Sequence, residues 1–301
     1  MTASDLAIDH RDSTGAHGFS ALIETEINGE PSRMTLFDTG PDNLSLIRNV
    51  GAMQVPIHKI ERIITSHWHA DHTGGLLSFL RLRESSGSTT VAGTNTPCVV
   101  DVYPNRPFAR GIAPGPHYDK VIARLPADPT FEEIASAGGV VEKHSEGHLV
   151  ADSMVWVSGE IPRVTSFEKG LPGGKLFKPS VGWIDETEII DERYAAIDVA
   201  GKGLILFSAQ IIGGLHLAGD SMTPRIEPTI DWLSKSLRPS PTWIIPMHCT
   251  GFVAKVALEQ AFGEGVVPAG VGVRVEVIGD QEHDKRLAPA VFDDEMVLLE
   301  P

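Results

Sequence analysis

Short apolar segments separated by turn residues dominate the chain. These segments are rich in β-branched side chains and are bounded by glycine, proline, aspartate or asparagine. This combination of short length, β-branched content and flanking turn residues favours strands over helices. Strands are predicted for residues 19–27, 34–37, 60–66, 89–92, 98–103, 154–157, 194–199, 203–207, 243–245 and 271–278.

Helical periodicity is less frequent along the chain. Apolar residues recur at intervals of three or four positions in four segments only. Because the predicted strands outnumber the helices, and the helices fall between groups of strands, we expect two sheets packed face to face with helices outside them. The predicted class is therefore α+β, with helices over residues 72–83, 131–137, 229–237 and 252–262.

Two long stretches have no hydrophobic period. Residues 105–129 are rich in proline, glycine, arginine and aspartate, and residues 168–188 in glycine, proline and charged residues. Both are predicted to be long loops, and such loops in a compact domain are usually functional or disordered. Sandwich folds often reach 301 residues as one unit. We expect a single domain over residues 1–301 with its core at residues 16–278.

Charge and composition exclude several classes of function. The formal net charge is −15 and no basic block occurs, so we expect no nucleic-acid partner. The N-terminus lacks the apolar core of a signal peptide, and polar residues interrupt the most apolar stretch, residues 203–219. No membrane association is therefore predicted. Two cysteines are too few for a disulfide framework, which favours a reducing, cytoplasmic location.

Three histidines and one aspartate lie within six positions of the segment SHWHADHTGG, residues 66–75. His67 and His69 follow a predicted strand, along which alternate side chains point to the same side. Asp71 is expected at the N-cap of the next helix, which His72 begins. Imidazole nitrogens and a carboxylate are ligands for zinc, iron or manganese, and such an ion lowers the pKa of bound water to about 7. The segment therefore predicts a metal centre.

The pattern His-x-His-x-Asp-His at residues 67–72 resembles the signature of the metallo-β-lactamase superfamily. The upstream segment LFDTG, residues 36–40, is similar to the strand-to-turn element of that superfamily. The resemblance implies that Asp38 supports the metal loop from behind, because a metal-bound histidine commonly donates its other N–H to a carboxylate. It also implies an αββα sandwich with two metal ions, expected to be zinc with iron and manganese as alternatives.

Further segments resemble the dihydropterin-ribofuranosyl-aminobenzene-phosphate synthase-like subgroup of the superfamily. This resemblance implies that His248 joins Asp71 and His72 on the second metal ion. A histidine at the end of a predicted strand suits a ligand, although a lone histidine there is more often a core residue. The segments are AHGFSALIE from Ala16, VSGEIPRVTSFEKG from Val157, GGLHLAG from Gly213, PMHCTG from Pro246 and VPAGVGVRVEV from Val267.

The chain departs from the subgroup near residue 210. There the subgroup has a Cys-Ser-His-Ala-Gly element, which supplies the last histidine of the first metal ion, followed by a helix and a strand. In this chain Ala209 and Gln210 lead directly to IIGGLHLAG. The fold is therefore expected to lack one helix and strand segment and to expose apolar sheet surface. His216 and Asp220 are the candidates to complete the metal site.

Three functions are compatible with these features. The first is a metal-dependent hydrolase, in which metal-activated hydroxide attacks an ester, amide or phosphoester and Asp71 orients the nucleophile or accepts its proton. The second is a synthase or transferase acting on a pterin precursor and a phosphorylated sugar donor, as the subgroup's name implies. The third is a degenerate homologue that binds metal without catalysis.

Either enzyme would act on a small-molecule substrate. Arg163 and Thr165 are candidate substrate contacts, and a surface ion pair is the alternative role for Arg163. A phosphorylated substrate needs a basic pocket, for which Arg163, Lys169, Lys175 and Lys178 form the nearest cluster. A homodimer is compatible with the sequence, which does not decide the oligomeric state.

Overall fold

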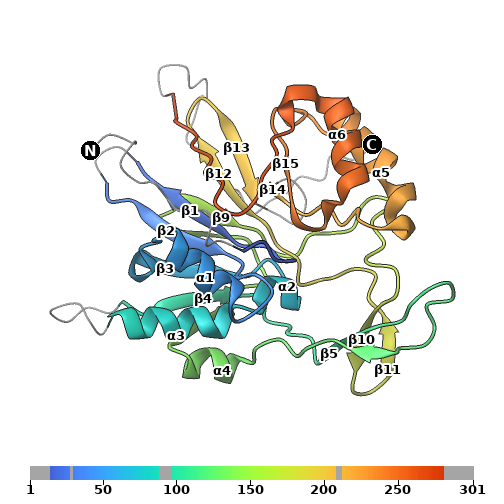
Figure 1. The fold of residues 1–301 in the computed structure, drawn as a ribbon, viewed down its shortest axis with the longest axis horizontal. Coiled ribbons are helices and arrows are strands. Elements are labelled where there is room, and N and C mark those ends of the chain that lie inside the picture. Colours follow the sequence, from blue (N-terminus) through green and yellow to red (C-terminus); the bar gives the residue numbers. More distant parts are fainter. Residues whose placement is uncertain (1–13, 28–29, 88–95, 208–211, 281–301) are drawn as a thin grey trace.

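The computed structural model describes residues 14–27, 30–87, 96–207 and 212–280. Two sheets pack against each other, and helices cover their outer sides (Figure 1). The first sheet has the order β1-β2-β3-β4-β7, in which β1 is antiparallel to β2 and the other neighbours are parallel. Its strands are β1 (Ala21–Thr25), β2 (Arg33–Phe37), β3 (Ile60–Ile64), β4 (Cys98–Val102) and β7 (Gly139–Lys143).

Helices cover one face of this first sheet. Buried apolar side chains of the helices, such as Phe79 and Ile134, pack against Ile63 and Val100 of the strands. The segment between β3 and the longest of these helices contains one further short helix, α2. The helices are α1 (Ser45–Ala52), α2 (Ala70–Thr73), α3 (Leu76–Gly87) and α4 (Phe131–Ser136).

The second sheet has the order β15-β14-β13-β12-β9-β8. Between the sheets, Phe37 and Ile64 of the first sheet pack against Val157 and Ala195 of the second. A third cluster packs α5 (Thr223–Asp231) and α6 (Phe252–Phe262) beside the short strands of the second sheet. The strands are β8 (His148–Val150), β9 (Val155–Val157), β12 (Ala195–Val199), β13 (Gly203–Phe207), β14 (Ile212–Gly213) and β15 (Ile245–Pro246).

The arrangement confirms the α+β sandwich expected from the sequence. The expected deletion near residue 210 and the strand expected at residues 89–92 fall outside the described residues. On either side of residues 208–211, Phe207 of β13 pairs with Ile212 of β14, and the two strands are parallel. β14 therefore begins beside the end of β13. Leu204 on β13 is 64% exposed.

Two expectations from the sequence are wrong. Residues 271–278 contain no strand, since they pair with no neighbouring strand of the described chain. The two stretches expected to be loops form a small four-stranded sheet, because segments about 60 residues apart in the sequence pair with each other. Its order is β11-β10-β5-β6, with β5 (Ala109–Ile112), β6 (Ala123–Arg124), β10 (Gly174–Lys178) and β11 (Gly182–Asp185).

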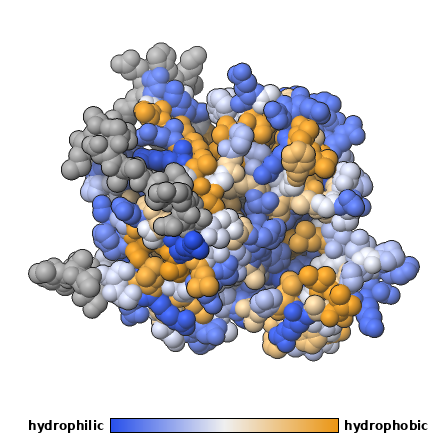
Figure 2. All heavy atoms as spheres, in the orientation of Figure 1, coloured by the Kyte–Doolittle hydropathy of each residue, from blue (hydrophilic) through white to orange (hydrophobic). Residues whose placement is uncertain are grey.

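The small sheet lies to one side of the sandwich, and apolar atoms gather on its surface (Figures 1 and 2). Phe108, Ile112 and Trp183 are among its exposed hydrophobic residues. In the described part of the chain, the helices are too short or too polar to cross a membrane. Both cysteines, Cys98 and Cys249, are buried and carry no disulfide.

One buried ion pair joins the second sheet to the first. Arg193, just before β12, is fully buried, and its guanidinium donates to the carboxylate of Asp101 on β4 at 2.9 Å and to the carbonyl of Thr65 at 2.8 Å. Burial by itself raises the pKa of Asp101, but the hydrogen bond from His148 and the charge of Arg193 outweigh it and lower the pKa to about 2. The carboxylate is therefore ionised at neutral pH and requires a cation beside it.

Replacing Arg193 tests the importance of this pair. Arg193→Met leaves the Asp101 carboxylate buried without its main counter-charge, so we expect the free energy of unfolding to fall by about 3–5 kcal/mol. Urea denaturation measures this change. The matched control is Arg81→Met, because Arg81 is exposed and its loss should cost less than about 0.5 kcal/mol. Equal stability of the two variants would contradict a structural role for the pair.

Candidate metal centre

The loop that follows β3 carries two of the expected metal ligands. His67 and His69 are both buried, and Nε2 of His67 lies 2.8 Å from Nδ1 of His69. His69 has extended backbone angles and is itself the N-cap of α2. The expectation that Asp71 caps this helix is therefore wrong by two residues, since Asp71 lies in the first turn. The shift leaves the Asp71 carboxylate available for other contacts.

The hydrogen bonds of this loop assign the protons on the two rings. The hydroxyl of Ser66 donates to Asp38 at 2.7 Å, so it accepts from Nδ1 of His67 at 2.9 Å. Nε2 of His67 is then a lone pair that faces Nδ1 of His69. Burial lowers the pKa of His67 well below its ordinary value, and the neighbouring histidines lower it further, so the ring is neutral. A neutral imidazole with a lone pair is the form that binds a metal ion.

A second group of donors is built around Asp71. Its Oδ2 lies 2.9 Å from Nε2 of His248 and 3.7 Å from Nε2 of His72. His248 lies at a positive φ of 49° in the turn that follows β15, and 177 residues separate it from Asp71. Burial opposes ionisation of Asp71, but the hydrogen bond from His248 and the nearby histidines lower the pKa of Asp71 below its usual range. Asp71 is therefore an anion at neutral pH.

Asp38 holds this arrangement from the end of β2. The carboxylate is completely buried and accepts from the N–H of Ser66 at 2.7 Å and from Nδ1 of His72 at 2.6 Å. In the neutral ring Nε2 then carries the lone pair, and this nitrogen is buried with no hydrogen-bond partner among the described residues. Burial tends to lower the pKa of His72, but the charges of Asp38 and Asp71 raise it overall, so this position favours a cation.

These observations fit a binuclear metal centre. Nε2 of His67 and Nδ1 of His69 lie 2.8 Å apart, and the unpartnered Nε2 of His72 lies beside an ionised carboxylate. Imidazole nitrogens with a carboxylate are a ligand set for zinc. The first group of donors is His67 and His69; the second is Asp71, His72 and His248.

The structure brings one of the two candidate replacements to this centre. The ring of His216 lies 6.3 Å from the ring of His67, measured between centroids, and burial together with the neighbouring His69 and His72 lowers the pKa of His216 to about 3. The turn that holds His216 is fixed because the N–H groups of Leu217 and Ala218 both donate to the carbonyl of Cys249 at 3.1 Å. His216 is therefore a neutral imidazole beside the donors that lack a third histidine.

Asp220 lies elsewhere. It is exposed, at the first residue of a short 3₁₀ turn (Asp220–Met222). Among the described residues, no hydrogen bond or ion pair joins its carboxylate to the centre. The positions of the two candidates thus favour His216 over Asp220 as the residue that completes the first group.

The two expected substrate contacts are engaged by carboxylates. Arg163 pairs with Glu192 and also donates to the carbonyl of Glu188 at 2.9 Å. The hydroxyl of Thr165 donates to Glu168 at 2.7 Å. Arg163 is linked to the centre through Glu192, whose charge contributes to the raised pKa of His72. The role of both residues in substrate binding remains a prediction.

The centre also contains residues that the sequence analysis missed. The peptide of Trp68 lies between the two histidines of the loop, and Asp191 accepts its N–H at 2.6 Å. Arg110 on β5 donates to the carbonyl of Trp68, to Asp191 at 3.0 Å and to Glu186 at 2.8 Å. We call Arg110, Glu186 and Asp191 the peptide clamp. It has no signal in the sequence, because its members come from segments without a hydrophobic period.

His17 is a further residue next to the centre. Its ring centroid lies 4.5 Å from that of His248, and one ligand atom each from His17, Asp71 and His248 lie within 4.8 Å of one another. His17 is exposed, so it lies on the solvent side of the second group. The segment AHGFSALIE contains this histidine, but a single exposed histidine carries no spacing that would identify it as part of a site.

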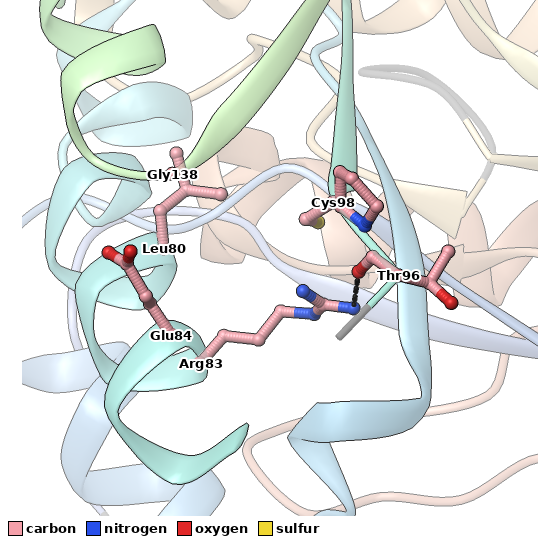
Figure 3. A pocket seen from close by; sticks show the side chains of 7 residues that line it. Leu80, Arg83, Glu84, Thr96, Cys98 and Gly138 are labelled. Atoms are coloured by element: carbon pink, nitrogen blue, oxygen red, sulfur yellow. Dashed lines mark hydrogen bonds between the residues drawn. The ribbon is translucent and has the colours of Figure 1, made fainter. Parts of the chain in front are cut away.

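A pocket on another part of the molecule contains none of these residues. It lies between α3 and the start of β4, where Arg83 donates to the carbonyl of Thr96 at 2.9 Å (Figure 3). Cys98 lines the pocket, and burial raises the pKa of its thiol to about 11. The thiol is therefore neutral at physiological pH and does not provide a nucleophile.

Two packed sheets whose loops bring histidines and an aspartate together at one edge are typical of a class of metal-binding proteins. Comparison with known proteins identifies that class. The sequence model of the metallo-beta-lactamase superfamily matches residues 16–166. The chain belongs to this superfamily.

Individual relatives agree with this assignment. The chain is 30% identical to the 7,8-dihydropterin-6-methyl-4-(beta-D-ribofuranosyl)-aminobenzene-5'-phosphate synthase of Methanocaldococcus jannaschii, over 82% of this chain and 85% of the relative. An uncharacterised protein of the same organism is 26% identical over 81% of this chain and 88% of its own length. The structure of Tm1679, described as a metal-dependent hydrolase of the beta-lactamase superfamily, superposes with a TM-score of 0.59 at 17% identity, covering 88% of this chain and 94% of that one.

The carboxylate of Asp38 provides a direct test of the centre. Asp38→Asn removes the negative charge behind His72 while keeping a residue that tolerates the positive φ of 60° found there. We expect zinc affinity, measured by competition with a chromophoric chelator, to fall by about 10- to 100-fold. Asp42→Asn is the control, because Asp42 is exposed and accepts from the N–H of Ser45 at the start of α1 instead. An unchanged affinity in a folded Asp38→Asn protein would contradict the role of Asp38.

The peptide clamp makes a second prediction. Arg110→Lys keeps the buried positive charge but cannot bond Trp68, Asp191 and Glu186 at once, since lysine lacks the planar fork. We expect zinc affinity to fall about tenfold, as for other residues that orient metal ligands. The control Arg124→Lys changes an exposed arginine of the adjacent strand β6. If both variants bind zinc as the parent does, the clamp does not position the loop.

Proposed function

We propose that the chain is a metal-dependent hydrolase with a binuclear zinc centre. His67, His69 and His216 would hold one ion, and Asp71, His72 and His248 the other. The observation that carries this proposal is the convergence of buried histidine nitrogens, one of them unpartnered, with an ionised carboxylate. The neighbouring position of His216 supports it further, because the third histidine of the first group is otherwise missing.

The residues of the chain have distinct tasks in this proposal. Zinc ions, when bound, supply activation of water near neutral pH and polarisation of the scissile oxygen. Asp38 keeps the proton of His72 on Nδ1, which leaves Nε2 available as a ligand. Asp71 is the one carboxylate among the six proposed ligands, and 27% of its side chain is accessible. Being ionised, it can accept a hydrogen bond from an attacking water and orient it towards an ester, amide or phosphoester.

A synthase activity is the second candidate, supported by the 30% identity to a named phosphate synthase. A phosphorylated substrate requires cations that are free to bind it. Arg163 is paired with Glu192, and Lys175 lies 2.6 Å from Asp185. The remaining members of the expected basic cluster, Lys169 and Lys178, are exposed. Because two of the four cations are already neutralised by carboxylates, we place hydrolysis before the synthase reaction.

Metal analysis together with a substrate panel tests the proposal. We expect the purified chain to hold at least two equivalents of zinc, iron or manganese, two of which are lost in the His69→Ala, His72→Ala double variant. Hydrolysis of p-nitrophenyl acetate or bis(p-nitrophenyl) phosphate should disappear after treatment with a chelator and return on addition of zinc. His216→Ala should lose one equivalent, whereas the control Asp220→Ala should lose none.

Two results would decide against hydrolysis. Less than half an equivalent of metal in the folded wild-type protein would indicate a homologue without a functional centre. A metal-replete protein that hydrolyses neither compound, but joins a pterin precursor to a phosphorylated sugar donor, would establish the synthase activity instead.

A further inference from the structure

A second group of metal-binding side chains lies where the chain passes from the first sheet to the second. Asp101 is on β4, His144 follows β7, and His148 begins β8. One ligand atom of each lies within 4.8 Å of the other two. We propose that Asp101, His144 and His148 bind a divalent transition metal ion. This site, which we call the edge site, is independent of the proposed hydrolase activity.

His148 has an acceptor next to each of its ring nitrogens. Nδ1 lies 3.2 Å from the carbonyl oxygen of Glu146, and Nε2 donates to Oδ2 of Asp101 at 2.7 Å. A neutral imidazole carries one proton, so it can donate to only one of two acceptors. A metal ion between Nε2 and Asp101 would take the place of that proton and leave Nδ1 to donate to Glu146.

His144 supplies the observation that favours a metal ion over a proton. Its ring stacks on that of His148, with centroids 3.8 Å apart and an angle of 22° between the planes. Its Nε2 is buried and has no hydrogen-bond partner among the described residues. A single proton between His148 and Asp101 leaves this nitrogen unsatisfied, whereas a metal ion bound by all three residues satisfies it. Two imidazoles and a carboxylate suit zinc, cobalt, nickel or copper.

The guanidinium of Arg62 places a positive charge beside Asp101 in the edge site. Its Nη1 lies 2.9 Å from Oδ2 of Asp101 and 2.8 Å from Oε2 of Glu142, so one nitrogen bridges two carboxylates. The Arg62 side chain is 19% exposed and can turn towards solvent, while Arg193 stays on the other oxygen of Asp101. A metal ion would replace Arg62. Glu142, whose Oε2 is 3.6 Å from Nε2 of His144, would become available as a fourth ligand.

The position of the edge site gives it a structural role. Asp101 belongs to the first sheet and His148 to the second, so an ion held by both would join the sheets at their edge. Arg193 lies between the edge site and the candidate metal centre. Its backbone N–H donates to the carbonyl of Ser66, and its guanidinium donates to Asp101. We therefore expect the ion to stabilise the fold without taking part in the reaction.

The test uses full-length protein in which the candidate metal centre is disabled by His69→Ala and His72→Ala. We expect this variant to keep one equivalent of Zn²⁺ and to show a visible Co²⁺ absorption band. Adding His144→Ala or His148→Ala should abolish both signals. Adding Arg62→Gln should tighten Zn²⁺ binding about tenfold, because a competing positive charge is removed. His117→Ala is the matched control, since His117 is exposed, and it should leave both signals unchanged.

Two outcomes would overturn the proposal. One is a folded variant that binds neither Zn²⁺ nor Co²⁺, even with Arg62→Gln. The other is an equivalent of metal that survives simultaneous replacement of His144 and His148. Should the disabled background fail to fold, the count is made with the candidate metal centre intact. Replacing His144 must then remove one equivalent, and an unchanged count overturns the proposal.

Discussion

The buried carboxylate of Asp38 is the interaction on which the candidate metal centre depends. It lies at the end of β2 and accepts hydrogen bonds from the backbone and hydroxyl of Ser66 and from His72. These contacts order the loop after β3 and place a hydrogen-bond partner on Nδ1 of both His67 and His72. A neutral side chain at this position would leave the proton on His72 undetermined, and the loop would lose the acceptor that orders it.

The small sheet holds the same loop from the opposite side. Arg110 and Glu186 come from segments about 75 residues apart, and β5 and β10 bring these segments together. Asp191 and Arg110 bind the N–H and the carbonyl of Trp68, so the backbone between the two neighbouring histidines is held on both sides. The centre therefore depends on contributions from outside the αββα sandwich as well as from the sandwich itself.

Membership of the metallo-beta-lactamase superfamily accounts for the fold and for the shared histidine pattern. It does not determine the substrate, because one scaffold of this kind carries many chemistries. Near the candidate centre, Phe207 of β13 pairs with Ile212 of β14, and the following turn brings His216 towards His67. The carbonyl of Cys249 holds this turn next to His248, so the two late histidines are positioned together.

The sequence by itself determined the sandwich, the histidine loop and the supporting role expected of Asp38, because these depend on local periodicity and on residues close in the chain. It did not reveal the small sheet, whose strands Ala109–Ile112 and Gly174–Lys178 are short and rich in turn residues. Nor could it show that His216 lies near His67 while Asp220, four residues further along, is exposed. Only the tertiary structure decided these points, because each depends on segments distant in sequence that meet through backbone pairing and buried charge.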